Sequence, residues 1–439
     1  MHIISLTNFE LQDNEMKWTL NNIQFKIKYM FDINYKFINT FKLIPLIQAC
    51  CLATSYNNKV SINSNIAINE ETKHFISEYA KMQYMFNMEQ LDIKIKSNIP
   101  KIKIIFPKDI YKDEIIDIVK VKNIISSWSG GKDSYLTIKL LQECGYKVVP
   151  TTTKWNTIAF NRGTHPFIND HDEINKNIIA SVALGNKMKL LFTKALNDQN
   201  IFIKNKQSGT FLSKKELPMI LYHSFYMNVQ NINNILYGLH KNIKHVFMGD
   251  EADVNGSHIY CGFKVQTSVG QGFKNKKLIN NYLTSIYGKN STQIHSLLYP
   301  LHGPLEVKLL IERYKSVKFS SCLTMIGNAC SKCPKCLATL LTCKSLGYDP
   351  SILGINQDKL IKNFKSQITD SYLLPDDEVI YWYVKNCVKY PEMNFIVQEL
   401  LDETQHNIDF DPLIPLKNKY DTIPKFIRKD IIKIYNEYA

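Results

Sequence analysis

The stretch "SSWSGGKDSYLTIKLLQ" (126–142) constrains the fold more than any other part of the sequence. Its glycine pair follows a short apolar run (121–128) typical of a strand and precedes a run (134–145) with the apolar spacing of a helix. Glycines at such a junction let backbone N–H groups turn toward an anion, and the helix N-terminus adds the positive end of its dipole. The stretch therefore predicts a phosphate-binding turn, with hydroxyl donors from Ser129 and Ser134 and with Asp133 holding the turn.

The elements after this turn alternate in kind. The apolar patterns predict further strands at 146–153, 188–195 and 244–250, and helices at 170–185 and 225–242. This order is typical of an α/β protein with a doubly wound parallel sheet. Ligands of such sheets bind at the carboxyl ends of the strands, which is where "SWSGGKDS" and "MGDEAD" both lie.

The 439 residues suggest two or three domains. Residues 1–115 mix strand-like alternation with a helical run at 70–86, so we expect an α+β N-terminal domain. Residues 120–349 would form the domain that carries the turn. Residues 350–439 contain three helical runs and predict a helical C-terminal extension, with helices at 380–390, 395–403 and 425–439.

The chain carries a net charge of +14, which favours anionic partners such as nucleotides, nucleic acid or an acidic protein surface. The basic residues are spread out, without an arginine-rich block, so solvated lysines account for most of this charge and a nucleic-acid partner is not favoured. The N-terminus lacks the pattern of a signal peptide, and the apolar stretch 41–53 is too short to span a bilayer. We expect that stretch to be a buried helix of a soluble, cytoplasmic protein without a membrane partner.

Four of the ten cysteines fall within residues 322–336. In a chain without a secretion signal, such clustering indicates a metal site more than disulfides. Two C-x2-C turns can present thiolates to a tetrahedral Zn²⁺ ion, and Lys332 and Lys335 would offset the negative charge. Free thiols or a redox pair are the alternatives, and Cys343 fits a core position. The sequence predicts a closed, structural zinc site formed by Cys322, Cys330, Cys333 and Cys336.

The turn fits neither of two common phosphate-binding motifs, GxxxxGK[ST] and GxGxxG. It resembles SGGxDS, the PP-loop of ATP pyrophosphatases, and every fixed position matches. The resemblance implies that ATP is cleaved between its α- and β-phosphates, with Mg²⁺ bridging the phosphates. Lys132 occupies a variable position, where a solvated side chain and a catalytic one both remain open. By resemblance, Lys132 and Asp133 would be catalytic, and the ATP-binding residues would be Ser129, Gly130, Gly131, Lys132, Asp133 and Ser134.

The turn and the cysteine spacing together resemble the 7-cyano-7-deazaguanine synthase family of queuosine-precursor biosynthesis, over residues 123–350. Members adenylate the carboxylate of 7-carboxy-7-deazaguanine. Ammonia attacks the acyl-adenylate, and a second ATP-driven step gives the nitrile. The resemblance implies a PP-loop fold in which the zinc ion is structural.

Two stretches depart from the family pattern. Where the family has Asp-Cys-Arg, this chain has "GDEADVNGSHIYCGF" and lacks the arginine. Its acidic residues could bind Mg²⁺, a purine-like edge or an amine, or could form a solvated loop; they are Asp250, Glu251 and Asp253. The segment "NTIAFNRGTHPF" replaces a Gln-Arg-His segment, with Arg162 and His165 as candidate substrate contacts.

The two extensions resemble enlarged synthase-like proteins of bacterial anti-phage cassettes. That resemblance implies that the activated deazaguanine is joined as an amide to the N-terminus of a partner protein, with the extra parts docking the partner. A synthase that uses ammonia, a PP-loop tRNA thiolase or lysidine-type ligase, and a non-enzymatic nucleotide-binding subunit remain as alternatives.

Overall fold

The structure is a computed structural model of the chain. It describes residues 2–56, 59–91, 93–94, 102–109, 114–118, 122–155, 177–183, 187–199, 216–316, 319, 329–331, 333–362, 377–403 and 410–438.

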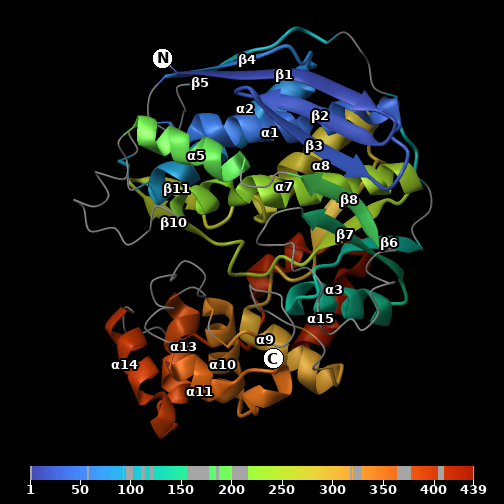
Figure 1. Cartoon of the computed structure of the whole chain (residues 1–439). Helices are drawn as coiled ribbons and strands as arrows, with labels where there is room; N and C mark the ends of the chain where they lie inside the picture. Colours follow the sequence, from blue (N-terminus) through green and yellow to red (C-terminus); the bar gives the residue numbers. More distant parts are fainter. Residues whose placement is uncertain are drawn as a thin grey trace.

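One ten-stranded sheet runs through the upper part of the molecule (Figure 1). In spatial order its strands are β12 (Gln293–Ser296), β9 (His245–Met248), β6 (Asn123–Ser127), β7 (Lys147–Trp155), β8 (Ile178–Ala183), β3 (Ile23–Tyr29), β2 (Glu15–Leu20), β1 (His2–Gln12), β4 (Val60–Ser64) and β5 (Ile102–Ile105). Neighbours are parallel from β12 to β8 and from β1 to β5, and antiparallel between β8 and β1. The predicted α/β class and a large, mostly parallel sheet are therefore confirmed.

The five parallel strands at one end of the sheet wind outward in two directions from β6. The chain proceeds from β6 to β7 and β8 on one side, then returns to β9 and β12 on the other. Strand β6 is buried on both faces: Ile125 belongs to one core with helix α7 (Glu216–Lys241), and Ile124 belongs to a second core with helix α3 (Lys132–Glu143). The sheet order reverses between β6 and β9, which is where such sheets bind ligands.

Two predicted elements are wrong. The helix expected at 170–185 contains strand β8, and the strand expected at 188–195 is helix α5 (Lys187–Asp198). The run "IIASVA" is short, apolar and rich in β-branched residues, which suits a buried strand. In α5 the buried residues recur at helical spacing, on one face: Met188, Leu191, Phe192, Ala195 and Leu196. The strands predicted at 121–128, 146–153 and 244–250 and the helices predicted at 134–145 and 225–242 are confirmed.

The N-terminal strands continue the sheet, because β3 pairs antiparallel with β8. Helices α1 (Ile38–Thr54) and α2 (Glu70–Gln90) pack against α7 and α8 (Phe273–Tyr287). Buried hydroxyls join them, since Thr40 and Tyr287 lie 2.9 Å apart and Thr72 and Tyr282 lie 3.1 Å apart. The sheet and its core thus cross the expected boundary at 115–120 without a break, and the boundary itself stays a prediction.

The most apolar helical stretch, Tyr35–Thr54, is long and apolar enough to cross a membrane. In the fold, 94% of that window is buried inside the protein. It contacts α2, α7 and the N-terminal strands, so it is a core helix, as predicted for 41–53.

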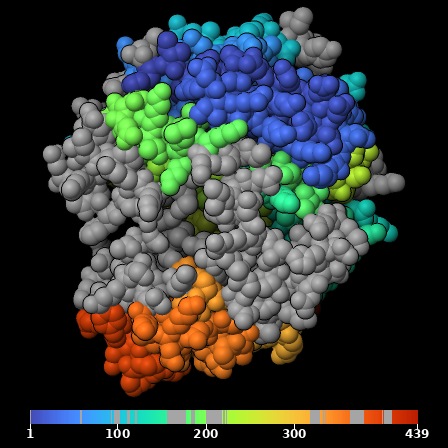
Figure 2. All heavy atoms as spheres, viewed as in Figure 1, coloured from blue at the N-terminus to red at the C-terminus, as the bar shows by residue number. Residues whose placement is uncertain are grey.

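The C-terminal part is helical and covers the second core. Helices α9 (Gly303–Lys308), α10 (Pro334–Leu346), α13 (Asp377–Cys387) and α14 (Asn394–Glu403) lie together below the sheet (Figure 1). Helix α15 (Lys425–Asn436) returns to the sheet, where the Tyr435 hydroxyl donates to the Leu297 carbonyl at 2.9 Å. Figure 2 shows N-terminal residues (blue) at one end of the molecule and residues of the C-terminal part (orange to red) at the other.

A histidine pair lies where α15 meets the sheet. His245 Nδ1 and His295 Nε2 are 3.1 Å apart on neighbouring strands, and the Phe426 ring of α15 lies 4.2 Å from the His245 ring, centroid to centroid. Burial lowers the pKa of His245 to about 4, assisted by Lys244. Burial likewise lowers the pKa of His295, to about 3. Both rings are therefore neutral at neutral pH.

We expect acid to destabilise the protein through this pair. An unfolded histidine titrates near pH 6.5. Between pH 6.5 and pH 4, His245 therefore binds a proton in the unfolded chain but not in the folded protein, so the free energy of unfolding decreases as the pH is lowered. At pH 5 the loss is about 2 kcal/mol for His245. Urea unfolding at pH 7.5 and pH 5 measures the loss of stability on acidification. This loss should be smaller in His245→Gln than in the wild type by about this amount, and should equal that of the wild type in the exposed control His74→Gln. An equal loss in all three proteins would contradict the assignment.

Candidate functional site

The predicted phosphate-binding turn joins β6 to α3. Gly130 has φ 75°, in the left-handed region that favours glycine. The Ser134 hydroxyl accepts from the Ser129 amide at 3.3 Å and donates to the Gly131 carbonyl at 3.1 Å, which closes the turn on itself. No side chain caps the N-terminus of α3, so the helix presents its first N–H groups and its positive dipole end at the turn.

The end of β9 lies directly against this turn. A Cβ atom on Gly249 would come within 2.8 Å of the Asp133 carbonyl carbon and of the Ser134 nitrogen. Only glycine allows this approach, which brings the acidic stretch after β9 to the start of α3. The two motifs identified in the sequence therefore meet at the switch point of the sheet.

A largely buried cluster of charges lies at this meeting point. The Lys132 ammonium donates to Glu251 Oε2 at 2.5 Å, to Glu306 Oε2 at 2.6 Å and to Asp133. Oxygens of the three carboxyl groups lie within 4.8 Å of one another. Glu306, on α9, has a fully buried side chain.

The sequence analysis missed Glu306. It belongs to "GPLEVKLL", which has no motif spacing. The signal that could have drawn attention to it is a single carboxylate in an apolar helix, because a buried charge needs a partner.

Burial and mutual contact shift the pKa values of all four groups. Burial disfavours the charged form of Lys132, but its three acidic neighbours outweigh burial and raise its pKa well above the usual range. For Asp133, Lys132 outweighs burial and lowers the pKa. Burial raises the pKa of Glu251 to about 7 and raises that of Glu306, both helped by the neighbouring carboxylates. These shifts favour the charged forms of Lys132 and Asp133 and the protonated forms of Glu251 and Glu306.

The carboxyl cluster fits a divalent cation. Mg²⁺ prefers oxygen ligands, of which carboxylates are the commonest from protein. Within the described residues, Glu306 Oε1 is buried and has no hydrogen-bond partner. Gly303 borders the cluster, since a Cβ there would lie in ordinary contact, 3.6 Å from Glu251 Oε2 and 3.7 Å from the Lys132 ammonium.

The three acids predicted after β9 have three different environments. Glu251 faces Lys132. Asp250 is buried, pairs with Lys276 of α8 and accepts from Gln271 at 3.3 Å, so it ties the strand end to α8. Asp253 lies 2.6 Å from His302 Nδ1. They do not form the solvated acidic loop that was one alternative. The candidate contacts Arg162 and His165 lie outside the described residues.

A cysteine cluster at the start of α10 can hold a metal ion such as zinc. Cys330 and Cys333 lie 3.7 and 3.5 Å from Cys336, sulfur to sulfur. These separations exceed a disulfide bond of about 2.05 Å. They match the separation of about 3.8 Å expected for thiolates 2.3 Å from one tetrahedral Zn²⁺ ion. The proposed fourth ligand, Cys322, lies outside the described residues.

Cys343 lies in the second core, where burial raises its pKa to about 12, so its thiol stays protonated. It is no member of the cluster among the residues described.

The cysteine cluster and the charge cluster are neighbours. Helix α10 packs on α9, which carries Glu306. The Lys335 side chain, between two of the cysteines, also helps to lower the pKa of Asp133. A metal ion that fixes the start of α10 would therefore also fix one wall of the charge cluster.

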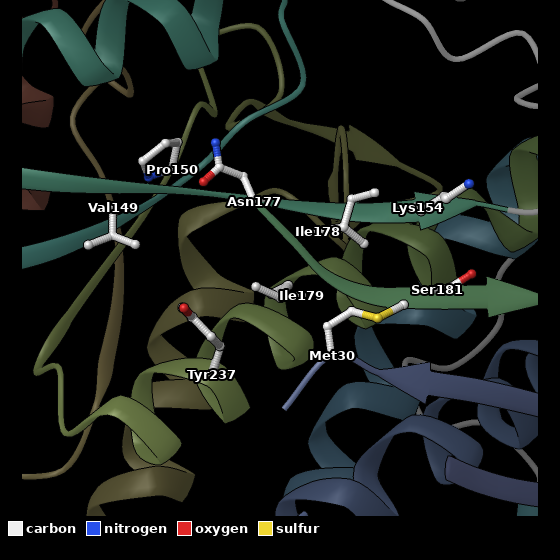
Figure 3. Close-up of a pocket in the computed structure, with 9 residues that line it drawn as sticks. All are labelled: Met30, Val149, Pro150, Lys154, Asn177, Ile178, Ile179, Ser181 and Tyr237. Atoms are coloured by element: carbon white, nitrogen blue, oxygen red, sulfur yellow. The ribbon is translucent and has the colours of Figure 1, made fainter. Parts of the chain in front are cut away.

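A separate cavity of about 360 Å³ lies on β7 and β8 (Figure 3). The residues that line it include neither an acidic side chain nor a member of the charge cluster; they are Met30, Val149, Pro150, Lys154, Asn177, Ile178, Ile179, Ser181 and Tyr237. The candidate site therefore rests on the turn and the charge cluster.

We expect Cys333→Ser to lose bound zinc, because it removes one of three thiolates that meet at one point. Zinc content per folded chain, measured by atomic emission after gel filtration, should fall by at least half. The matched control is the exposed Cys261→Ser, which should keep the wild-type content. Zinc retained in full by Cys333→Ser would show that the cluster is not the zinc site.

The comparisons with known proteins give no match: no family model, no curated protein and no solved structure matches this chain. The argument for function therefore rests on the residues of this chain. They bring a glycine turn, an uncapped helix N-terminus and three carboxyl groups to one edge of a parallel sheet.

Proposed function

We propose that the protein is a PP-loop ATP pyrophosphatase that adenylates the carboxylate of a 7-deazaguanine such as 7-carboxy-7-deazaguanine. An amine then attacks, and the product is an amide between the deazaguanine and a partner protein, made in anti-phage defence. One observation carries the proposal. The SGGKDS turn lies at the switch point of the sheet and faces carboxyl groups from the loop after β9 and from α9.

The residues of the turn suit the phosphates of ATP. Backbone N–H groups at 129–134, the Ser129 and Ser134 hydroxyls and the N-terminus of α3 would bind the β- and γ-phosphates. Asp133, Glu251 and Glu306 would hold Mg²⁺, which supplies charge neutralisation for the leaving pyrophosphate.

The reaction needs two balanced steps. A carboxylate oxygen attacks the α-phosphorus, the bond to the β-phosphate breaks, and acyl-adenylate and pyrophosphate form. The amine then attacks the acyl carbon, loses a proton, and AMP leaves. With ammonia as the amine and a second ATP, the same site would serve the nitrile synthesis of queuosine biosynthesis.

Two features favour the conjugating enzyme over the synthase: the missing arginine and the extensions at both ends. The N-terminal strands extend the sheet, and the C-terminal helices cover α3 and α9. Both extensions thus offer surface to a partner while bracing the site. The net charge of +14 is the feature that favours the alternative of a tRNA-modifying ligase or thiolase. Against it, the Cys-x2-Cys pairs of the described residues are those of the cysteine cluster.

Asp133→Asn should lower pyrophosphate release by at least roughly a hundredfold, because it removes a charge from the site that would bind magnesium and phosphates. The assay contains ATP, Mg²⁺ and 7-carboxy-7-deazaguanine, with ammonia, a candidate partner protein or tRNA as acceptor. Asp358→Asn, at an exposed position of α11 (Gln357–Lys362), is the matched control and should retain full release.

The acceptors separate the alternatives. A mass gain on the first residue of a partner protein supports conjugation, and ammonia-dependent nitrile supports the synthase. Release that requires tRNA would overturn both, and undiminished release by Asp133→Asn would overturn the assignment of the turn.

A further inference from the structure

Lys132 pairs with all three carboxyl groups of the charge cluster, of which that of Glu306 is fully buried and the other two are partly buried. An ammonium has three N–H donors, and here the carboxyl groups of Asp133, Glu251 and Glu306 provide one acceptor each. The lysine is therefore fully paired at a position to which the sequence motif assigns no fixed residue.

The carboxyl groups that pair with Lys132 are the same ones that would coordinate a divalent cation, each through one oxygen. These oxygens lie within 4.8 Å of one another, and a magnesium ion holds oxygens at about 2.0–2.1 Å. The ammonium and the metal ion would therefore compete for one space. Glu306 Oε1, buried and without a partner among the described residues, remains as a further ligand atom for the larger charge.

The competition follows from charge. Carboxylates that are brought together out of water repel one another and lose their hydration, so in every state the cluster holds a cation, protons or both. Lys132 supplies one positive charge on a flexible four-carbon stem, and a divalent ion supplies two. The backbone of Lys132 lies in the first turn of α3, beside the N–H groups of the phosphate-binding turn. A displaced ammonium thus has the phosphate position within reach.

We propose that Lys132 is the resident counter-ion of this metal site. Its ammonium holds the three carboxyl groups together while no divalent ion is bound, and an incoming ion displaces it toward the phosphates of the nucleotide. The displacement step rests on the proposed function, whereas the competition rests on the ion pairs alone. As a consequence, binding of the metal ion is coupled to binding of the nucleotide. Without nucleotide the metal ion binds weakly, because the displaced lysine then lacks a partner.

The test measures Mn²⁺ binding by the full chain through the electron paramagnetic resonance signal of the free ion. Lys132→Met keeps the length of the side chain and removes its charge. Without nucleotide, this variant should bind Mn²⁺ at least tenfold more tightly than the wild type. Adding α,β-methylene-ATP should strengthen Mn²⁺ binding to the wild type and change the variant much less.

Lys139→Met is the matched control, because Lys139 is on the same helix and contacts the Tyr135 ring. It should bind Mn²⁺ as the wild type does. The melting temperature gives a second readout: Lys132→Met should melt lower than wild type without Mn²⁺ and regain the difference when Mn²⁺ is added. If Lys132→Met is not recovered folded, Lys132→Gln keeps hydrogen-bond donors without the charge and is expected to give the same result.

Mn²⁺ binding by the folded variant that is no tighter than wild type, in the absence of nucleotide, overturns the proposal. The outcome is separate from the proposed function. Tighter Mn²⁺ binding by a protein that binds no adenine nucleotide would support the counter-ion and reject the ATP pyrophosphatase. Pyrophosphate release by the wild type, together with an Mn²⁺ affinity that is unchanged in Lys132→Met, would support the ATP pyrophosphatase and reject the counter-ion.

Discussion

The pairing of β6 with β9 is the constraint on which the rest of the site depends. These strands are neighbours in space but are separated in the chain by β7, β8 and the helices between them. Because the strands are parallel, the turn after β6 and the acidic stretch after β9 must emerge at the same edge. Gly249 then sets how closely they approach, since any side chain there would collide with the start of α3. A shift of either strand by one residue would move the whole charge cluster apart.

The two faces of the sheet are covered by helices from different parts of the chain. Helices α1, α2, α7 and α8 cover one face, and α3, α9, α10, α13 and α15 belong to the core on the other. The second face carries Glu306 and the cysteine cluster. Glu306, which no sequence motif predicted, therefore lies on a helix that packs against the C-terminal helices. The extensions are therefore structural parts of the site's support, whatever else they bind.

Sequence reasoning succeeded where the chemistry is local. The glycine turn, β6, α3 and β9 follow from adjacent residues, and the three described cysteines of the cluster are close in sequence. It failed where a partner is distant. The pairing of β3 with β8 joins residues about 150 positions apart, and no periodicity encodes it. The exchange of strand and helix at 178–198 arose because short apolar runs suit either element until their burial is known. Asp250 and Glu251 are adjacent acids, yet only tertiary contacts make one a structural partner of Lys276 and the other part of the charge cluster.

Lys132 shows how tertiary context gives a role to a residue that a motif leaves open. In the sequence it is a variable position beside Asp133, indistinguishable from a solvated lysine. In the fold, Glu251 comes from the loop after β9 and Glu306 from α9, and their carboxyl groups, when ionised, would repel each other without a cation between them. If Lys132 is the resident counter-ion, the cluster would admit a metal ion only when another group accepts the lysine. A polyphosphate ligand at the turn would satisfy this condition, because it would bring surplus negative charge to the place where the lysine side chain begins. The counter-ion would thus make cation binding conditional on a phosphate ligand, without any moving domain.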